Sequence, residues 1–316
     1  MKRYILTVGP SLLHKTALNK IHQTEFIYRI NGAHGSLADI EGYIAEIRRQ
    51  VVTADILLDL PGNKVRTKGI ELRIEAGQEF SVPAGAFNYA DFYKLLKPGM
   101  KVWANDSTLE FEVIDATADR IVFLSKSTGQ LVENKGVHVR GIHAELPFLF
   151  EKDLELIDLA NKHGLAFVGL SFVRTRKDVE TARKLIEGSE IICKVETLAA
   201  VKDLNNILAA AEYFLIDRGD LSTDIGIENV PRYQNYIIDK AKYFDRKVFL
   251  ATQILKNMEN RPIPTIAEID DLYNISKQGV YGIQLSEETA IGAYVEECIA
   301  VLYRTQNCVV NENIIA

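Results

Sequence analysis

Eight short apolar runs alternate with amphipathic stretches along this 316-residue chain, and this alternation constrains the fold more than any other feature. Each run is rich in β-branched or aromatic residues, which is typical of strands buried on both faces. The stretches between most runs have apolar residues at i, i+3 and i+4 and predict helices. Strands that alternate with helices form a parallel sheet, and eight such units are the number in a closed (β/α)8 TIM barrel. The predicted strands are residues 4–8, 26–30, 56–59, 166–170, 191–195, 213–217, 248–251 and 281–285.

The region from residue 68 to residue 141 breaks this rhythm. It has little helical periodicity, and glycines and prolines separate short alternating segments. Segments 101–104, 111–114 and 120–124 indicate antiparallel strands. We therefore predict a small all-β domain, a β-barrel, inserted after the third barrel strand, with residues 1–67 and 142–316 forming the (β/α)8 barrel. An insertion at the carboxyl end of a barrel strand could act as a lid over an active site.

Composition excludes several classes of protein. With 47% hydrophobic and 25% charged residues the chain is not globally disordered, and a net charge of −6 argues against a nucleic-acid partner. No apolar run approaches the roughly 20 residues needed to span a bilayer, and the N-terminal apolar segment is too short for a signal peptide. Cys193, Cys298 and Cys308 have neither metal-site nor disulfide spacing. We expect a soluble, cytoplasmic protein with no membrane or nucleic-acid partner.

Polar side chains follow most predicted strands at the point where each strand ends. The carboxyl ends of barrel strands meet at one mouth, so we expect these side chains to lie close together. Residues two apart on a strand face the same way, which directs Lys194 and Glu196 to one side. The polar residues at strand ends are Arg29, Asn31, Asp59, Ser171, Lys194, Glu196, Asp217–Asp220, Thr252, Ser286 and Glu288.

These residue types suit a divalent metal and an anionic substrate. Glu196 and Asp220 offer the hard oxygens that Mg²⁺ prefers. Lys194 and Arg29 could neutralise charge on a phosphoryl group or a developing enolate. Spacing alone leaves an alternative open, in which the two carboxylates pair with Lys194 and Arg218 in buried ion networks.

Several motifs in these positions resemble the pyruvate kinase family, in the same order and over nearly the whole chain. The family's barrel with an inserted β domain agrees with the predicted layout. Because the sequence stops after the eighth barrel helix, we expect the family's usual C-terminal domain to be absent. The matching segments are ILTVGP at 5–10, RINGAHG at 29–35, LDLPGNKVRT at 58–67, LP at 146–147 with EKD at 151–153, SFVR at 171–174, ICKVE at 192–196, DRGDL at 217–221, ATQ at 251–253 and LSEETA at 285–290.

The resemblance implies transfer of phosphate between phosphoenolpyruvate and ADP, giving pyruvate and ATP, with Mg²⁺ or Mn²⁺. Glu196 and Asp220 match the metal ligands, and Lys194 matches the lysine that stabilises the transferring phosphoryl group and the enolate. Thr252 matches a residue on the path that delivers a proton to the substrate. The resemblance also implies catalytic roles for Lys194, Thr252 and Arg29, substrate contacts for Ser171, Gly219, Asp220 and Thr252, and nucleotide contacts for Arg29, His34, Arg66, Asp106 and Lys135.

Departures from the family pattern predict potassium independence. Members that need potassium use side-chain oxygens where this chain has Ala33 and Leu60, while Asn31 and Asp59 are retained. Lys64 stands where those members have a glutamate, and an ammonium can replace the potassium charge. An exposed loop position for Lys64 is the alternative.

Other departures concern the substrate. Asp217 replaces a small alanine, and Glu287 replaces a glycine near the mouth. A carboxylate at position 217 would repel a substrate carboxylate unless it is protonated or paired, for instance with Arg218. The sequence does not determine the oligomeric state, and a homodimer is one option.

Three alternatives are therefore kept beside the kinase: a metal-dependent enolate enzyme (an aldolase, lyase or decarboxylase) acting on a pyruvate-like substrate, a phosphotransferase with another acceptor, and a non-catalytic binding or regulatory paralogue. Retention of the nucleotide-contact residues favours a phosphotransferase. Retention of Lys194 and the metal carboxylates argues against a non-enzyme.

Overall fold

The computed structural model describes residues 2–105, 108–139, 141–142 and 145–311, and it divides the chain into two compact units. One unit comprises residues 1–62 and 149–316, and the other comprises residues 63–148. The sequence placed these divisions at 67/68 and 141/142. Residues 63–67 belong with the insertion because Val65–Arg66 forms a strand of its sheet. Within the described part of the chain, no helix is both long enough and apolar enough to cross a membrane.

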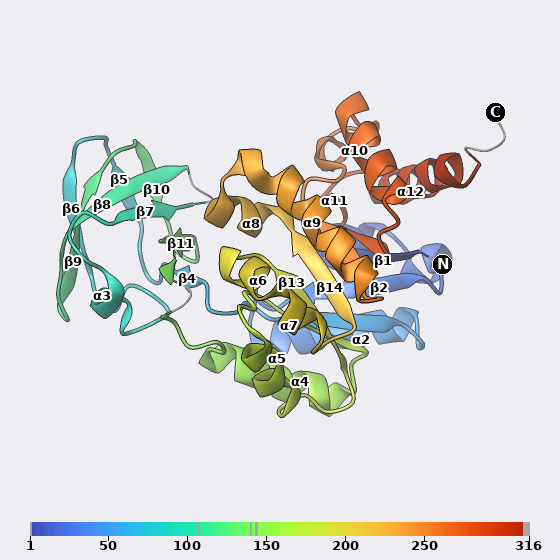
Figure 1. Ribbon diagram of the computed structural model, residues 1–316, viewed down its shortest axis with the longest axis horizontal. Coiled ribbons are helices and arrows are strands. Elements are labelled where there is room, and N and C mark those ends of the chain that lie inside the picture. The colour runs from blue at the N-terminus through green and yellow to red at the C-terminus, as the bar shows by residue number, and fades with distance from the viewer. Residues whose placement is uncertain (1, 106–107, 140, 143–144, 312–316) are drawn as a thin grey trace. The chain divides into compact units, whose positions relative to one another are not determined.

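The first unit is a closed barrel of eight parallel strands, in the order β1-β16-β15-β14-β13-β12-β3-β2 (Figure 1). This confirms the predicted (β/α)8 fold, and each predicted strand is present with its ends within one residue of the prediction. The strands are β1 (Arg3–Thr7), β2 (Phe26–Asn31), β3 (Asp55–Asp59), β12 (Phe167–Leu170), β13 (Glu190–Val195), β14 (Tyr213–Asp217), β15 (Lys247–Ala251) and β16 (Gly282–Leu285).

Helices connect these strands and lie outside them (Figure 1). Capping residues fix several helix starts: Ser36 and Thr265 each accept a hydrogen bond from the backbone N–H three residues on, which satisfies a free donor of the first turn. The helices are α1 (Leu18–Ile21), α2 (Leu37–Gln50), α4 (Glu151–His163), α5 (Arg176–Arg183), α6 (Leu198–Lys202), α7 (Leu204–Leu208), α8 (Arg218–Ile225), α9 (Val230–Tyr243), α10 (Ile266–Lys277), α11 (Glu287–Ala290) and α12 (Val295–Val310), with the shorter turns η1 (Ser11–Lys15), η3 (Ile227–Asn229) and η4 (Lys256–Glu259).

The side chains inside the barrel form two layers, an apolar one in the middle of the strands and a polar one at their carboxyl ends. A buried apolar cluster takes residues from seven strands: Ile5, Ile27, Leu57, Phe167, Ile192, Leu215, Phe249 and Ala251. Successive side chains of a strand point to opposite faces, so the residue two positions further on also faces inward. On five strands that residue is polar, and it lies at the carboxyl end: Thr7, Arg29, Asp59, Lys194 and Asp217.

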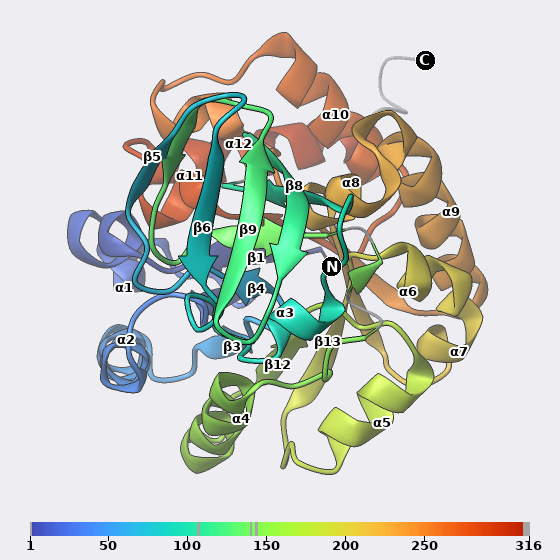
Figure 2. The same ribbon diagram turned by 90° about the vertical axis from the view of Figure 1, so that its left-hand side faces the viewer.

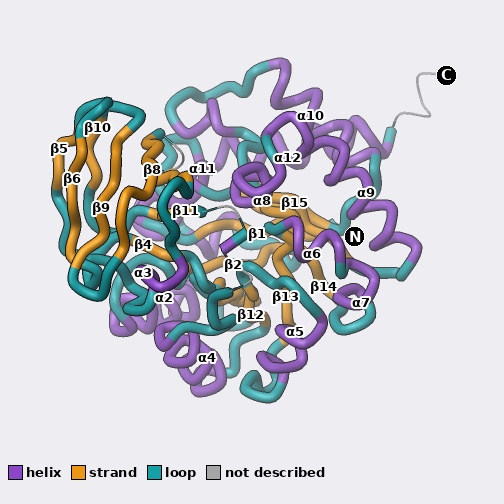
Figure 3. Tube along the Cα trace, turned by 60° about the vertical axis from the view of Figure 1, so that its left-hand side comes forward, coloured by secondary structure: helices purple, strands orange, loops and turns teal. Residues whose placement is uncertain are grey.

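The second unit is built mainly from antiparallel strands, as predicted for the insertion. Figure 2 shows β6, β9 and β8 side by side, and Figure 3 shows how little helix the unit contains. The described strands form a six-stranded sheet, β4-β11-β7-β8-β9-β6, and a two-stranded sheet, β10-β5, where the sequence predicted a small β-barrel. The elements are β4 (Val65–Arg66), β5 (Leu72–Ile74), β6 (Glu79–Pro83), α3 (Phe92–Leu95), β7 (Lys101–Ala104), β8 (Leu109–Ala116), β9 (Arg120–Ser125), β10 (Gly129–Leu131) and β11 (Gly136–His138).

One buried carboxylate of the barrel unit fixes the two points at which the chain leaves that unit and returns to it. Asp153 Oδ1 accepts a hydrogen bond from the N–H of Gly62 at 2.9 Å, and Oδ2 accepts one from Phe150 at 2.7 Å. The Asp153 side chain has no exposed surface. Burial raises its pKa to about 6, although both backbone donors favour the charged form.

Stability is therefore expected to depend on pH at this position. The unfolded carboxyl group releases its proton near pH 4 and the folded one near pH 6, so the free energy of unfolding falls, by roughly 3 kcal/mol from this group, as pH rises across that interval. Asp153→Asn removes this pH dependence. The substitution is also expected to lower the free energy of unfolding by about 1–3 kcal/mol at pH 4, because an amide nitrogen cannot accept a backbone N–H. Urea unfolding between pH 4 and 7 measures both effects. Asp158→Asn, an exposed position on α4, is the control; equal pH slopes for wild type and Asp153→Asn would contradict the prediction.

Candidate active site

Arg29 and Asp59 form a buried ion pair at the mouth of the barrel. Asp59 Oδ2 lies 2.8 Å from Arg29 Nε and 2.7 Å from Arg29 Nη2. Arg29 Nη1 also donates to the Thr7 hydroxyl at 2.9 Å. Gly169 makes room for this carboxylate, because a Cβ there would lie 2.6 Å from Asp59 Oδ1. Three strands thus hold the Arg29 guanidinium in one orientation.

Lys194 carries the central positive charge of the mouth. Its Nζ lies 2.8 Å from Glu196 Oε1, 3.3 Å from Asp59 Oδ2 and 3.8 Å from Asp217 Oδ2. It also donates to the Ser171 hydroxyl at 3.0 Å. Burial by itself lowers the pKa of Lys194, but the three carboxylates outweigh burial and raise the pKa, so the ammonium stays charged.

Glu196 is fully buried and holds a strained part of the backbone. Its Oε2 accepts a hydrogen bond from the N–H of Phe172 at 2.7 Å, and Phe172 has a φ of +53°, which is rare for a bulky residue. Burial raises the pKa of Glu196, and the charges of Asp220 and Asp217 raise it further, while Lys194 lowers it. Such strain persists where the surrounding structure over-determines it, and it is common at functional sites.

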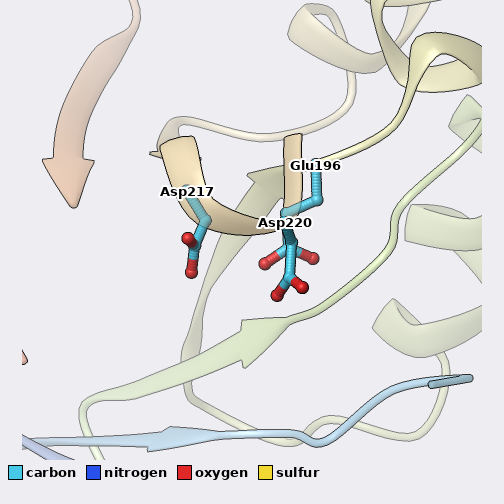
Figure 4. A group of neighbouring side chains, drawn as sticks. All are labelled: Glu196, Asp217 and Asp220. Carbon is cyan, nitrogen blue, oxygen red and sulfur yellow. The ribbon is translucent and has the colours of Figure 1, made fainter. Parts of the chain in front are cut away.

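Three carboxylates gather beside Lys194. Glu196, Asp217 and Asp220 each offer an oxygen within 4.8 Å of the other two, and Figure 4 shows Glu196 and Asp220 next to each other with Asp217 alongside. Asp217 precedes α8 and Asp220 lies in its first turn, whereas Glu196 follows β13. An oxygen-only donor set of this size fits Mg²⁺ or Mn²⁺, which are usually held by one or two carboxylates together with substrate oxygens.

The structure brings Thr252 to the same mouth. Its hydroxyl donates to Asp217 Oδ1 at 2.6 Å. Arg218 forms an ion pair with Asp271 at 2.8 Å and donates to the Thr252 carbonyl. The Asp217–Thr252 bond joins strand ends 35 residues apart and was missed from the sequence, where only the inward register of position 217 could have signalled it.

The remaining predicted residues of the barrel unit lie at or shortly after the strand ends. The Ser171 hydroxyl donates to the Leu60 carbonyl at 2.7 Å, and Gly219 N–H donates to Asp217. Asn31 Oδ1 accepts the N–H of Ala33 at 3.1 Å in a tight turn, and His34 is exposed in the loop that follows.

In the inserted unit, Arg66 and Lys135 lie on neighbouring chain segments. Arg66 pairs with Gly136 across β4 and β11, and the Lys135 N–H donates to the Thr67 hydroxyl at 2.8 Å. The Lys64 side chain lies against Gly136, where a Cβ would come within 2.7 Å of Lys64 Cε. Asp106, which the sequence analysis predicted in the inserted unit together with Lys135, lies outside the described residues.

The fold and the mouth together define a class of protein. A (β/α)8 barrel with a buried lysine, an arginine and a carboxylate group at the carboxyl ends of its strands is typical of metal-dependent barrel enzymes that act on anionic substrates.

Comparison with known proteins makes the class specific. Residues 2–299 match the family model for the pyruvate kinase barrel domain. The chain is 32% identical to a pyruvate kinase of Thermotoga maritima, over 95% of this chain and 69% of the relative. It is 30% identical to that of Geobacillus stearothermophilus, over 96% of this chain and 56% of the relative. A pyruvate kinase structure from Cryptosporidium parvum superposes with a TM-score of 0.86 and 26% identity, over 98% of this chain and 69% of that one.

The chain belongs to the pyruvate kinase family. It spans 56% of the length of the Geobacillus relative and 69% of the Thermotoga relative. The relatives carry the name of a kinase, and this favours the predicted phosphotransferase over an aldolase, a lyase, a decarboxylase or a non-catalytic paralogue.

Proposed function

We propose that this chain transfers a phosphoryl group between phosphoenolpyruvate and ADP, giving pyruvate and ATP. The observation that carries the proposal is the position of Lys194, whose charged Nζ lies beside the group of carboxylates formed by Glu196, Asp217 and Asp220. Glu196 and Asp220 would hold Mg²⁺ or Mn²⁺, which neutralises charge on the phosphoryl and enolate oxygens when bound. Phosphoryl transfer depends mainly on positioning and charge neutralisation, and this mouth is suited to both.

Some residues of the barrel unit would bind the substrate, and another would help to deliver a proton to it. Lys194 would stabilise the transferring phosphoryl group and the enolate oxygen that is left when the phosphorus–oxygen bond breaks. Arg29, which keeps donors beyond those used on Asp59 and Thr7, would bind phosphate oxygens. Ser171 and the backbone at Gly219 would bind substrate oxygens, and Thr252 would lie on the path of the proton that converts the enolate to pyruvate.

For the nucleotide we propose contacts by Arg29 and His34 of the barrel unit and, separately, by Arg66 and Lys135 of the inserted unit, the segment predicted from the sequence to act as a lid. Arg66 on β4 pairs with Gly136 on β11, the residue after Lys135, and this supports a joint role for the two cations on the nucleotide phosphates. Asp106 completes the proposed set by its position in the sequence. The assay that tests the function is pyruvate formation from phosphoenolpyruvate with ADP and Mg²⁺; no turnover by the folded protein would refute the proposal.

Potassium independence is proposed for the same reaction. Asn31 Oδ1 accepts the Ala33 N–H, and Asp59 Oδ2 is engaged with Arg29 and Lys194, so these two oxygens of the retained residues already have partners within the protein. Lys64 would supply the positive charge instead.

Turnover in sodium alone is expected within about twofold of turnover in potassium. Lys64→Met is expected to lose roughly tenfold in sodium, about 1.4 kcal/mol, because the proposed substitute for the potassium charge is then missing. A wild-type enzyme that works only with potassium would contradict this.

We also propose a homodimer in the cytoplasm. An apolar groove of about 430 Å³ between α10 and α12 supports the assembly, because exposed apolar patches commonly mark contacts between proteins. Ile266 lines this groove with 90% of its surface exposed. Sedimentation equilibrium tests the dimer, and fractionation of cells tests the location.

A further inference from the structure

Thr252 has a backbone conformation that few side chains adopt. Its φ is +76°, and that of Gln253 is +54°. A β-branched residue in this region is strained, and the strain needs neighbours that hold it in place. The neighbours are two consecutive residues at the end of β14.

Arg218 and Asp217 bind opposite ends of Thr252. Arg218 donates to the Thr252 carbonyl from Nε at 3.1 Å and from Nη2 at 2.7 Å. Asp217 Oδ1 accepts the Thr252 hydroxyl at 2.6 Å and the Gly219 N–H at 3.2 Å. Gly219 permits this approach, because a Cβ there would lie 3.1 Å from Thr252 Cγ2.

The bond to Asp217 decides how the Thr252 hydroxyl can interact with other groups. A threonine hydroxyl has one proton and two lone pairs. Its proton is committed to Asp217 in a short hydrogen bond, and hydrogen bonds to a carboxylate are among the strong ones. Oγ1 can therefore meet a substrate only through its lone pairs, as an acceptor.

We propose that Asp217 is a positioning residue that fixes Thr252 as a hydrogen-bond acceptor and so determines which end of the substrate faces Thr252. The inference rests on the proposed function. The carboxylate and phosphate of phosphoenolpyruvate have no proton to donate, and they would face both the Oγ1 lone pairs and the negative charge of Asp217. The methylene carbon of the substrate is left to face Thr252.

This orientation places the protonation step beside Thr252. When the enolate becomes pyruvate, a new carbon–hydrogen bond forms at the methylene carbon. A water molecule supplies this hydrogen. One of its O–H groups donates a hydrogen bond to Thr252 Oγ1, and the proton of the other is transferred to the carbon. The resulting hydroxide is reprotonated from solvent. Asp217 acts through Thr252 and does not touch the reacting carbon.

The test compares Asp217→Ala with Asp217→Asn, each with Mg²⁺ present. Two rates are measured: pyruvate formation from phosphoenolpyruvate with ADP, and exchange of the methyl protons of pyruvate in heavy water, followed by proton NMR. Asp217→Ala frees the Thr252 hydroxyl and is expected to slow exchange by about ten- to hundredfold, with a smaller change in KM. Asp217→Asn keeps an oxygen that accepts the hydroxyl proton, and is expected to recover most of this loss.

Two further variants separate positioning from charge. Asp217→Ala in a Thr252→Val background is expected to add no further loss, because coupled residues are not additive. Glu287→Gln removes a carboxylate that pairs with Lys256, and is expected to leave exchange unchanged.

Each outcome decides the matter. Equal loss in Asp217→Asn and Asp217→Ala would show that charge alone acts and would overturn the inference, as would additive effects in the double variant. An active wild type with an unaffected Asp217→Ala would overturn the inference and leave the proposed function standing. A wild type that neither forms pyruvate nor exchanges its protons would overturn both.

Discussion

Lys194→Ala is expected to lower kcat for pyruvate formation by about 10³-fold or more, because the enolate and the transferring phosphoryl group lose their central positive charge. The effect is large because Lys194 is buried, and charges interact more strongly in a water-poor site. The pKa of Lys194 is raised by its three carboxylates, so the lysine remains charged across the whole working range of pH. Steady-state kinetics at saturating phosphoenolpyruvate and ADP measures the loss.

Stability must be measured on the same variant. Removing the ammonium leaves Asp59, Glu196 and Asp217 without their shared cation, and breaking a buried ion pair typically costs about 3–5 kcal/mol. Lys194→Met, which keeps most of the side-chain volume, distinguishes lost charge from a cavity. Lys247→Ala is the matched control, because Lys247 also pairs with a glutamate but lies away from the mouth on the surface. Near wild-type turnover in a folded Lys194→Ala would refute the catalytic role.

Glu196→Gln is expected to weaken Mn²⁺ binding by about 10²-fold, because a charged hard-oxygen ligand is replaced by a neutral one. The amide oxygen can still accept the N–H of Phe172, so the strained backbone at that residue keeps its support. The effect therefore isolates the charge of Glu196 from its structural hydrogen bond. Electron paramagnetic resonance of free Mn²⁺ gives the affinity without any requirement for turnover.

A second carboxylate provides the control for metal binding. Asp271 is paired with Arg218 and lies outside the group of three carboxylates. Asp271→Asn is expected to leave Mn²⁺ affinity unchanged, whereas Asp220→Asn is expected to resemble Glu196→Gln. Unchanged affinity in both Glu196→Gln and Asp220→Asn would place the metal elsewhere.

The barrel strands could be predicted from the sequence because burial on both faces leaves a local signature. The run 213–217 matches β14 residue for residue, and the other seven strands deviate by one residue at most. The insertion was harder to place. Val65–Arg66 was assigned to the barrel part of the chain, but it pairs with β11 of the inserted unit, and such long-range pairing has no local signal.

The composition of the mouth was also predictable, because a strand has a period of two. Ile192, Lys194 and Glu196 share a face, as do Leu215 and Asp217, so an apolar layer is followed by a polar one. The partners of these side chains were not predictable. Arg218 was left as a partner of the mouth carboxylates, yet it pairs with Asp271, because the start of α8 turns its guanidinium toward the Thr252 carbonyl.

The number of barrel strands, the side of each one that faces inward and the residue types at their carboxyl ends are predictable from the sequence alone. These follow from periodicity and from the cost of burying polar groups, which act over a few residues at a time. The tertiary structure was needed to show that Asp217 accepts the Thr252 hydroxyl, that Asp153 holds Gly62, and that Lys194 lies near both Asp59 and Asp217. Closing the barrel sets those distances, because it joins residues that lie tens to more than a hundred positions apart along the chain.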